Sequence, residues 1–403
     1  MRILILNVDY PGFLRSMYER NPGLETSSYA DQMRARNESL FGVADFYSRN
    51  LASLGHHAWD LHINNEILQQ VWAADHGLVS PSSTPGRREH RSVLAQVRKI
   101  GAGRIPQRLK PWLSPLTQRL SGQRALLTIL AEQIRHYKPE VILNQAVEWI
   151  PDEFLLEFKD DVRLIVGQVA SPLTATKRLK SYDLLISSLP NFVDRFRRQG
   201  LHAELVKLAF EPSVLETLSQ SKTVTDVSFV GTLSGDHQER LKLLEWVAER
   251  VDLRVWGRLD STLPAASALR GRHSGPAWGR EMYEILQQSR ITLNYHIGVA
   301  GQYANNLRLY EATGVGTLLL TDAKENLHEM FAPGSEVAVY RNAEECVELA
   351  QHFLDHESER KSIADRGQRR TLRDHTYAIR MQELSALFER AISGHLAASP
   401  KYV

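Results

Sequence analysis

The chain has 403 residues, of which 43% are hydrophobic and 24% charged, and its formal net charge is +2. One core seldom serves more than about 250–300 residues, so this length predicts two domains in a soluble globular protein. No apolar run approaches the ~20 residues of a membrane-spanning helix. The single cysteine, Cys346, excludes an internal disulfide and fits a reducing, cytoplasmic compartment.

The first half of the chain alternates short apolar runs with longer helical patterns, which is typical of a parallel α/β sheet. The apolar runs predict strands at 2–8, 58–63, 140–144, 163–169, 183–188 and 203–208. Helices are expected at 38–54, 124–137 and 191–199, and the first and last of them end at Gly55 and Gly200. Residues 1–209 are therefore predicted to form a Rossmann-like N-terminal domain.

A basic segment interrupts this domain at about 65–122. Between Arg87 and Arg124 the chain carries ten basic residues and one acid, Glu89, with Trp112 and several leucines interleaved. Such a segment can lie on an anionic membrane surface or face a phosphate-bearing acceptor. The alternative is a solvated insertion between two strands.

The second half resumes the alternation after a polar stretch at 210–225, which indicates a linker. Strands are expected at 226–232, 252–257, 290–296 and 336–340, and helices at 237–250, 280–288, 343–356, 357–372 and 376–393. Residues 303–322 predict a short helix, a glycine-containing turn and a buried strand. A second domain at 226–375 and a terminal helix at 376–403 follow, so we expect two Rossmann-like domains facing across a cleft.

Ligand-binding residues are expected just after the predicted strands, because open α/β sheets bind ligands beyond the carboxyl ends of their strands. In the first half these positions hold Asp9, Tyr10, Gly12, Asn144, Gln145, Glu148, Gln168, Ser171 and Pro172. In the second half they hold Gly231, Thr232, Ser234, Trp256, Gly257, Tyr295 and His296.

The helix that begins near Asn305 or Asn306 combines features of a nucleotide site. Its free amides and the positive end of its dipole attract an anion, and the dipole contributes roughly 0.3–1 kcal/mol per charge. The guanidinium of Arg308 adds a forked cation suited to phosphate oxygens. Glu311, further along, would repel phosphate but could accept hydrogen bonds from the two vicinal hydroxyls of a ribose. The alternative is that Glu311 only pairs with Arg308 at the i, i+3 spacing.

The sequence lacks the motifs of metal sites, of several nucleotide-binding loops and of serine-hydrolase nucleophiles. No spacing resembles a metal-ligand cluster, a Walker A loop or a G-x-S-x-G nucleophile elbow. The glycines at 101 and 103 are not a dinucleotide fingerprint, since no strand precedes them and the third glycine is missing. We therefore expect neither a metal nor a cofactor.

Six segments of the second half, in order, resemble the C-terminal half of CgeB-like (spore-protein type) glycosyltransferases, which are related to family 4 glycosyltransferases. They are SFVGT, VWG, EMYEILQQSRITLNYH, NNLRLYEATGVGTLLLTD, MFAPGSEVAVYRNAEECVELA and RDHTYAIR, within about 226–380. The resemblance implies a GT-B fold, with a nucleotide sugar bound mainly by the C-terminal domain. It also implies that no metal is needed and that the last helix crosses back to the N-terminal domain.

The resemblance also implies roles for individual residues. Glu311 matches the family's ribose-binding glutamate, and the donor loop that approaches the diphosphate and sugar corresponds to Asn305, Asn306 and Arg308. The first strand of the donor domain is followed by a matching glycine turn at Gly231 and Thr232, and His296 stands in a family-like LN-x-H. One position departs: Tyr303 stands where many family 4 enzymes carry a second glutamate, so a retaining mechanism is not implied.

The expected activity is transfer of a sugar from a nucleotide-diphosphate sugar to an acceptor hydroxyl. The helix start and Arg308 would stabilise the departing diphosphate, with Arg240 as a second cation, and His296 would contact the sugar or diphosphate or pack at a strand end. An inverting enzyme would also need a base, for which Asp9 and Glu148 are the candidates.

The acceptor is expected to be a glycan, a lipid-linked molecule or a protein, in cell-surface glycan or glycoconjugate synthesis, and no nucleic-acid partner is expected. The protein would be cytoplasmic, with membrane contact at the inner face through Arg87–Arg124. Two alternatives stay open: a GT-B-fold epimerase that acts on the nucleotide sugar itself, and a non-catalytic nucleotide-sugar-binding protein.

Overall fold

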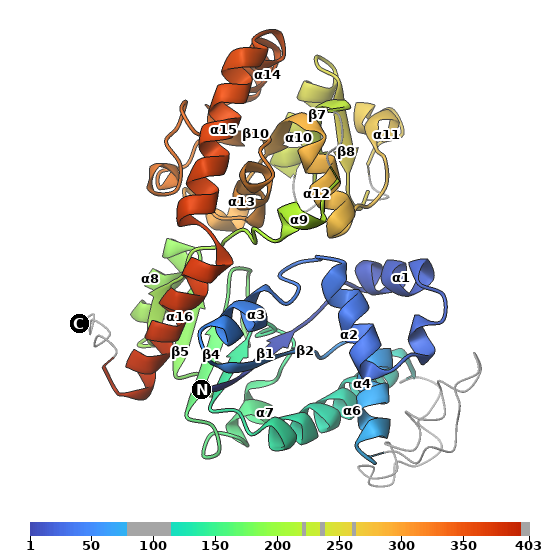
Figure 1. Cartoon of the computed structure of the whole chain (residues 1–403), viewed down its shortest axis with the longest axis vertical. Coiled ribbons are helices and arrows are strands. Elements are labelled where there is room, and N and C mark those ends of the chain that lie inside the picture. The colour runs from blue at the N-terminus through green and yellow to red at the C-terminus, as the bar shows by residue number, and fades with distance from the viewer. Residues whose placement is uncertain (79–113, 220–222, 234–237, 260–262, 396–403) are drawn as a thin grey trace. The chain divides into compact units, whose positions relative to one another are not determined.

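The computed structural model describes residues 1–78, 114–219, 223–233, 238–259 and 263–395. They divide into two compact units, the first with Met1–Glu38, Ala52–Gln168 and Leu173–Leu184, and the second with Ser39–Leu51, Val169–Pro172 and Leu185–Val403. Two sheets of parallel strands organise the chain (Figure 1). Most of the basic segment, including Arg87 to Lys110, lies outside the described residues.

The first sheet has six strands in the order β2-β1-β3-β4-β5-β6. Their bounds are β1 Arg2–Asn7, β2 His57–His62, β3 Val141–Asn144, β4 Leu164–Gln168, β5 Leu184–Ser187 and β6 Ala203–Leu205. In the register, Ile3 of β1 pairs with Ala58 on one side and Val141 on the other. All six strands were predicted, because strands of parallel sheets are buried on both faces and read as continuous apolar runs.

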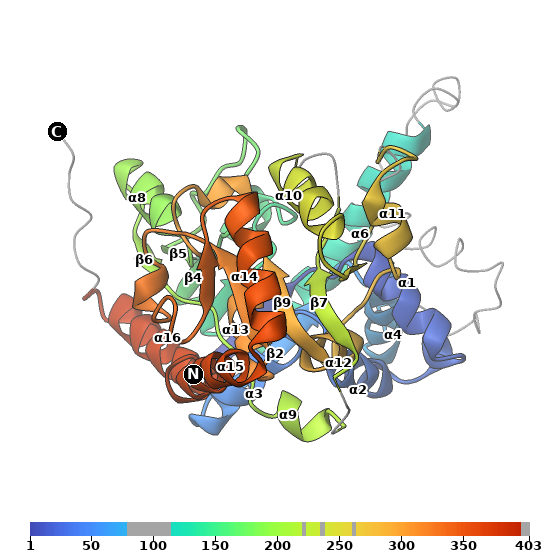
Figure 2. The same ribbon diagram turned by 90° about the horizontal axis from the view of Figure 1, so that it is seen from above.

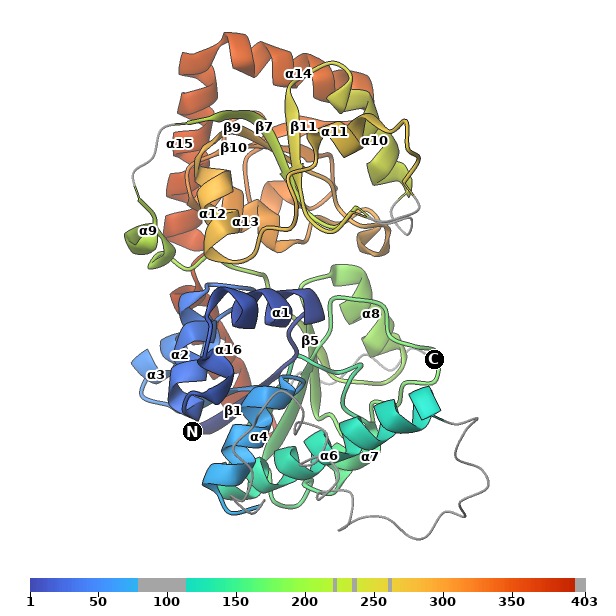
Figure 3. The ribbon, with the colours of Figure 1, turned by 90° about the vertical axis from the view of Figure 1, so that its right-hand side faces the viewer.

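The helices connected to this sheet are α1 Pro11–Arg20, α2 Tyr29–Glu38, α3 Phe46–Ser53, α4 Glu66–Asp75, α6 Ser114–Tyr137, α7 Asp152–Leu156 and α8 Pro190–Arg198. Helix α4 packs beside α6 (Figure 3), and α8 lies beside β6 (Figure 2). Helix α4 occupies part of the range predicted as a basic insertion, and α6 begins ten residues before its predicted start at Arg124.

The helix predicted at 38–54 is wrong at its start: only α3, from Phe46, lies within that range, and the preceding helix α2 was not predicted. α2 ends at Glu38 and α3 begins at Phe46. Between them Leu40 and Ala44 have positive φ angles of 58° and 41°, which no continuous right-handed helix permits. The turn is held by packing far along the chain, since Ser39 O accepts a hydrogen bond from the Arg280 amide at 2.7 Å.

The second sheet has five strands in the order β11-β10-β9-β7-β8. Their bounds are β7 Thr225–Val230, β8 Leu253–Trp256, β9 Ser289–Asn294, β10 Leu318–Asp322 and β11 Ala338–Tyr340. The chain moves from β7 out to β8 and then back across β7 to β9, so the topological switch point lies between β7 and β9. Ligands of open α/β sheets bind at such a point.

The helices of this half are α9 Val214–Thr217, α10 Gln238–Ala248, α11 Ala268–Arg272, α12 Arg280–Gln287, α13 Leu307–Gly314, α14 Ala343–Asp355, α15 Glu357–Asp374 and α16 Tyr377–Ile392. Helix α13 packs against α12, α15 and β10. The predicted order of helix, turn and buried strand at 303–322 is confirmed by α13, Gly316 at φ 85° and β10. Within the described ranges, no helix is both long and apolar enough to cross a membrane.

Candidate functional site

The carboxyl edge of the second sheet gathers polar side chains around the switch point. Gly231 follows β7, His296 lies two residues beyond β9, and Asp322 ends β10. A glycine is required after β8, because a Cβ on Gly257 would stand 1.9 Å from the Gly231 carbonyl oxygen. The turns after β7 and β8 therefore lie so close together that only a residue without a side chain fits at position 257.

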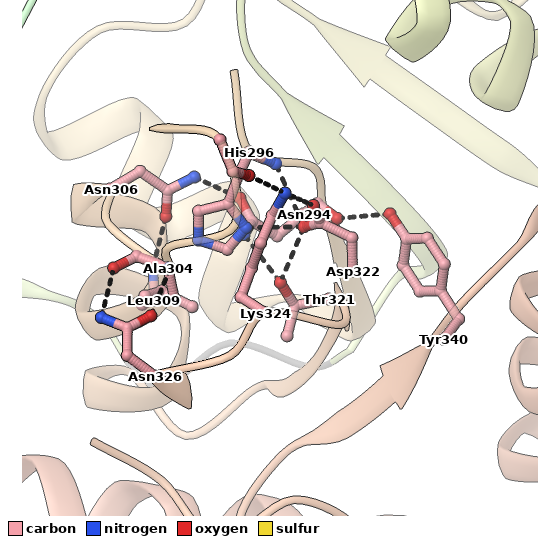
Figure 4. Close-up of polar contacts among 11 residues, drawn as sticks. Asn294, His296, Ala304, Asn306, Leu309, Thr321, Asp322, Lys324, Asn326 and Tyr340 are labelled. Carbon is pink, nitrogen blue, oxygen red and sulfur yellow. Dashed lines mark hydrogen bonds and ion pairs between the residues drawn. The ribbon is translucent and has the colours of Figure 1, made fainter. Parts of the chain in front are cut away.

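His296 and Asp322 form a buried pair at this edge (Figure 4). His296 Nδ1 lies 2.6 Å from Asp322 Oδ1, and the His296 amide donates to the same oxygen at 3.1 Å. Lys324 Nζ lies 3.3 Å from Asp322 Oδ2 and donates to the Gly301 carbonyl at 2.8 Å. Burial opposes ionisation of Asp322, but hydrogen bonds from the His296 side chain and amide, with Lys324, hold its pKa below the usual value.

A hydrogen-bonded chain ties the start of α13 to the strands. Asn306 is the N-cap, and its Oδ1 accepts from the Leu309 amide at 3.3 Å. Its Nδ2 donates to Asn294 Oδ1 at 2.7 Å, and Asn294 Nδ2 donates to Thr321 Oγ1 at 2.9 Å. The Tyr340 hydroxyl donates to the Asn294 carbonyl at 2.7 Å (Figure 4). The helix start is thus fixed to β9, β10 and β11.

Neighbouring residues hold the loop before α13. Asn305 Nδ2 donates to Ser188 Oγ at 2.6 Å, within the second compact unit. Asn326 Oδ1 accepts from the Ala304 amide at 2.6 Å. Both contacts restrict the segment that carries the first amides of α13, which is the feature expected of a preorganised anion site.

Glu311 and Arg308 form the i, i+3 ion pair that the sequence left as an alternative. Arg308 Nη1 lies 2.8 Å from Glu311 Oε2, and Arg308 Nη2 donates to the Val230 carbonyl at 3.1 Å. Burial raises the pKa of Glu311, and the attraction of Arg308 only partly opposes it. Arg308 thus joins the end of β7 to Glu311, which is itself buried, and the ribose-binding role of Glu311 stays a prediction.

Arg240 braces the turn after β7. Its Nη2 donates to the Thr232 carbonyl, and its guanidinium lies 5.7 Å from the centre of the Phe229 ring. Burial lowers the pKa of Arg240 to about 10. The structure thus brings Gly231, Thr232 and Arg240 together, with the guanidinium engaged by the protein; its role toward a diphosphate stays a prediction.

The two predicted base candidates belong to the first compact unit. Asp9, 3% exposed, contacts Arg36 Nη2 at 2.7 Å and His62 Nδ1 at 2.9 Å. Burial opposes its ionisation, yet His62 and Arg36 hold the pKa of Asp9 far below the usual value. Glu148 is exposed, and its carboxylate accepts a hydrogen bond from the Thr174 amide at 3.2 Å.

Asp322, Lys324 and Asn326 were not among the predicted site residues, and neither were the strand residues Asn294, Thr321 and Tyr340 that hold the cluster. Asp322 ends a predicted strand, so the strand-end rule that selected His296 applies to it equally. Lys324 and Asn326 lie beyond that strand and carry no local signal; only the fold brings them to the site. In the part of the chain that the structure describes, no group of three or more His, Cys, Asp or Glu side chains is arranged to hold a metal ion.

Comparison with known proteins gives one family match and several fold matches. Residues 239–386 match the model of a family described as glycosyl transferase-like, and this stretch includes His296, α13 and Asp322. No curated protein matches the chain by sequence. Sucrose-phosphate synthase from Thermosynechococcus elongatus is similar in structure, with a TM-score of 0.55, 10% identity, and coverage of 98% of this chain and 100% of that one.

Two further solved structures extend the likeness over nearly the whole chain. Anabaena HepE in complex with UDP and glucose has a TM-score of 0.54 at 10% identity, covering 96% of this chain and 99% of that one. AviGT4, a glycosyltransferase involved in avilamycin A biosynthesis, has a TM-score of 0.54 at 13% identity, covering 97% and 98%. The fold is GT-B. At these identities the likeness establishes the two Rossmann-like sheets and their order along the chain.

Proposed function

We propose that this protein is a glycosyltransferase that moves a sugar from a nucleotide-diphosphate sugar to an acceptor hydroxyl. One observation carries the proposal: the segment matching the glycosyl transferase-like family contains the polar cluster at the switch point of the second sheet. A ligand is expected at that point on general grounds. The GT-B fold and the sequence resemblance to CgeB-like enzymes support the same activity.

The donor would lie across the ends of β7 and β9. Its diphosphate would contact the first amides of α13, where the helix dipole favours an anion. The Glu311 carboxylate would accept hydrogen bonds from the ribose hydroxyls, and its ion pair with Arg308 would hold it in position. Lys324, whose ammonium lies within the cluster, adds a second cationic group.

Departure of the diphosphate requires its growing negative charge to be stabilised, and oriented donors in a water-poor site do this effectively. We propose that the amides of α13, with Lys324, carry out this role without a metal. Deprotonation of the acceptor is assigned to the first compact unit. The low pKa of Asp9 makes it a weak proton acceptor, so Glu148 is the stronger of the two candidates.

UDP-glucose is the first donor to test, because the similar structure of Anabaena HepE contains UDP and glucose. The acceptor is proposed to be a glycan, a lipid-linked molecule or a protein, used in cell-surface glycan or glycoconjugate synthesis from the cytoplasmic side. Contact with the inner membrane face through Arg87–Arg124 is tested by vesicle sedimentation. Equal binding of anionic vesicles by the wild type and a charge-neutralised variant would rule that contact out.

The activity itself is tested by incubation with a panel of nucleotide sugars that includes UDP-glucose. A transferase releases free nucleoside diphosphate, slowly by hydrolysis when no acceptor is present. An epimerase would instead return an isomerised nucleotide sugar, and a binding protein would raise its thermal stability with the ligand but show no turnover. Either of those results would replace the proposed function.

A further inference from the structure

One ring nitrogen of His296 is hydrogen-bonded to another protein side chain, and the other ring nitrogen is not. The residue is 1% exposed, and Nδ1 faces Asp322 at 2.6 Å. Nε2 is shielded from solvent and has no hydrogen-bond partner among the described residues. Figure 4 shows this second nitrogen pointing away from Asp322. A buried polar atom without a partner is uncommon in proteins and calls for an explanation, such as a bound water, an ion or a functional contact.

The Asp322 carboxylate determines which nitrogen carries the hydrogen. Its Oδ1 accepts the His296 amide hydrogen at 3.1 Å and its Oδ2 lies 3.3 Å from Lys324 Nζ, and both contacts favour the ionised carboxylate. An ionised carboxylate accepts hydrogen bonds and donates none. His296 Nδ1 must therefore donate. Nε2 carries a lone pair if the ring is neutral and a second hydrogen if the ring is a cation.

The charges around the pair favour the neutral ring. Lys324 Nζ lies 3.3 Å from Asp322 Oδ2, so the carboxylate already has a cationic partner. Tyr340 and Tyr295 also interact electrostatically with Asp322, and burial raises the pKa of both, which keeps them neutral at pH 7. A hydrogen on Nε2 would add a second cation beside one carboxylate, on a ring that is 1% exposed and whose Nε2 faces no acceptor among the described residues, and a buried charge without its own partner is costly.

We infer that His296 Nε2 accepts a hydrogen bond from a hydroxyl of the donor sugar, an inference that rests on the proposed function. A phosphate oxygen has no hydrogen to offer a lone pair, so this atom does not hold the diphosphate. The amides at the start of α13 donate hydrogen bonds and suit the diphosphate, while the Glu311 carboxylate suits the ribose. His296 is therefore a specificity-determining residue that selects donor sugars carrying a hydroxyl at the contacted position.

Two variants separate the roles of the ring nitrogens. His296→Asn keeps a donor near the place of Nδ1, facing Asp322, but has no atom at the place of Nε2. His296→Gln is the matched control, because its side-chain oxygen can reach the place of Nε2. Circular dichroism and thermal unfolding of both variants establish that they are folded before their binding is compared.

Calorimetry with UDP and with UDP-glucose gives the decisive comparison. His296→Asn should lose about tenfold in affinity for UDP-glucose, the effect of one lost hydrogen bond to a buried group, and should bind UDP like the wild type. His296→Gln should recover part of the loss. An equal loss for both ligands would place the contact on the nucleotide, and no loss for either would remove it; each result overturns the inference.

A measurement that needs no ligand keeps the inference separate from the proposed function. A long-range ¹H–¹⁵N spectrum at pH 7.5 reports which nitrogens of His296 are protonated. We expect a protonated Nδ1 and an unprotonated Nε2, whereas a ring protonated at both nitrogens would overturn the inference. A wild type that binds neither UDP nor UDP-glucose would instead count against the proposed donor, and the spectrum would still decide the state of His296.

Discussion

Replacing Glu311 with glutamine separates a ligand-binding role for this side chain from a structural one. The carboxylate is buried and 2.8 Å from Arg308 Nη1, and burial raises its pKa more than Arg308 lowers it. A carboxyl group whose pKa is raised by folding stabilises the protein below its unfolded pKa, and this contribution is lost as the pH rises through the folded pKa. Glutamine removes that cost at pH 7 and can still accept from Arg308, so Glu311→Gln should be as stable as the wild type or more stable.

Binding should respond in the opposite direction. A hydrogen bond to a charged group contributes about 1.5–3 kcal/mol and a neutral one about 0.5–1.5 kcal/mol, so losing the charge should cost about 1.4 kcal/mol, or tenfold in the Kd for UDP. Glu311→Ala loses the acceptor completely and should weaken UDP binding further while the fold survives.

Calorimetry with UDP and thermal unfolding measure the two effects on the same samples. Glu132→Gln is the control, because it breaks an i, i+3 pair of the same kind, with Arg135 at 2.5 Å, on an exposed face of the first unit; its UDP affinity should equal that of the wild type. Unchanged UDP affinity in Glu311→Gln, together with a stability loss of about 3–5 kcal/mol, would show that Glu311 serves only its ion pair.

Three further predictions concern packing, charge and metal dependence. Gly314→Ala places a Cβ 2.4–2.6 Å from ring carbons of Phe210, whereas the control Gly271→Ala meets no atom within 4 Å. Overpacking should lower the free energy of unfolding of Gly314→Ala by about 1–3 kcal/mol. Equal melting temperatures for the two variants would contradict this. The ionised Asp9 contributes stability above its unfolded pKa of about 3.9, and this contribution is lost as the pH falls. The loss of unfolding free energy caused by Asp9→Asn should therefore be smaller at pH 3 than at pH 7. Urea titrations that give the same loss at both pH values would show that Asp9 is not held ionised by His62 and Arg36. Activity on UDP-glucose should persist in EDTA, and a loss restored by Mg²⁺ or Mn²⁺ would show that α13 and Lys324 do not act alone on the diphosphate.

The strands and several residues of the polar cluster at their ends could be predicted because their signals are local. Buried parallel strands read as short apolar runs, and polar residues at their ends are ligand candidates by position alone. This reasoning found His296, and it applies equally to Asp322, whereas Asn306 and Glu311 came from the polar start of the predicted helix and from the resemblance. The helix α1 was not predicted, although Pro11 at its first position is a local start signal.

The missed features depend on contacts between distant parts of the chain. Leu40 and Ala44 take left-handed conformations that their side chains do not favour, because the turn packs against Gly279 and Arg280. Asp9 lies 53 residues from His62 in sequence, and no spacing rule connects them. Local patterns therefore predict where a site lies, whereas the partners that set its protonation states come from the fold.

The most direct test of the central claim is release of nucleoside diphosphate from a nucleotide sugar, measured side by side for the wild type and Glu311→Ala. We predict that the wild type releases UDP from UDP-glucose, or the corresponding diphosphate from another donor in the panel, and that the variant releases it at least tenfold more slowly at a subsaturating donor concentration, from the loss of a charged hydrogen bond. Equal release by both proteins would contradict the assignment of Glu311 to the donor site. No release from any nucleotide sugar would contradict the proposed glycosyltransferase activity.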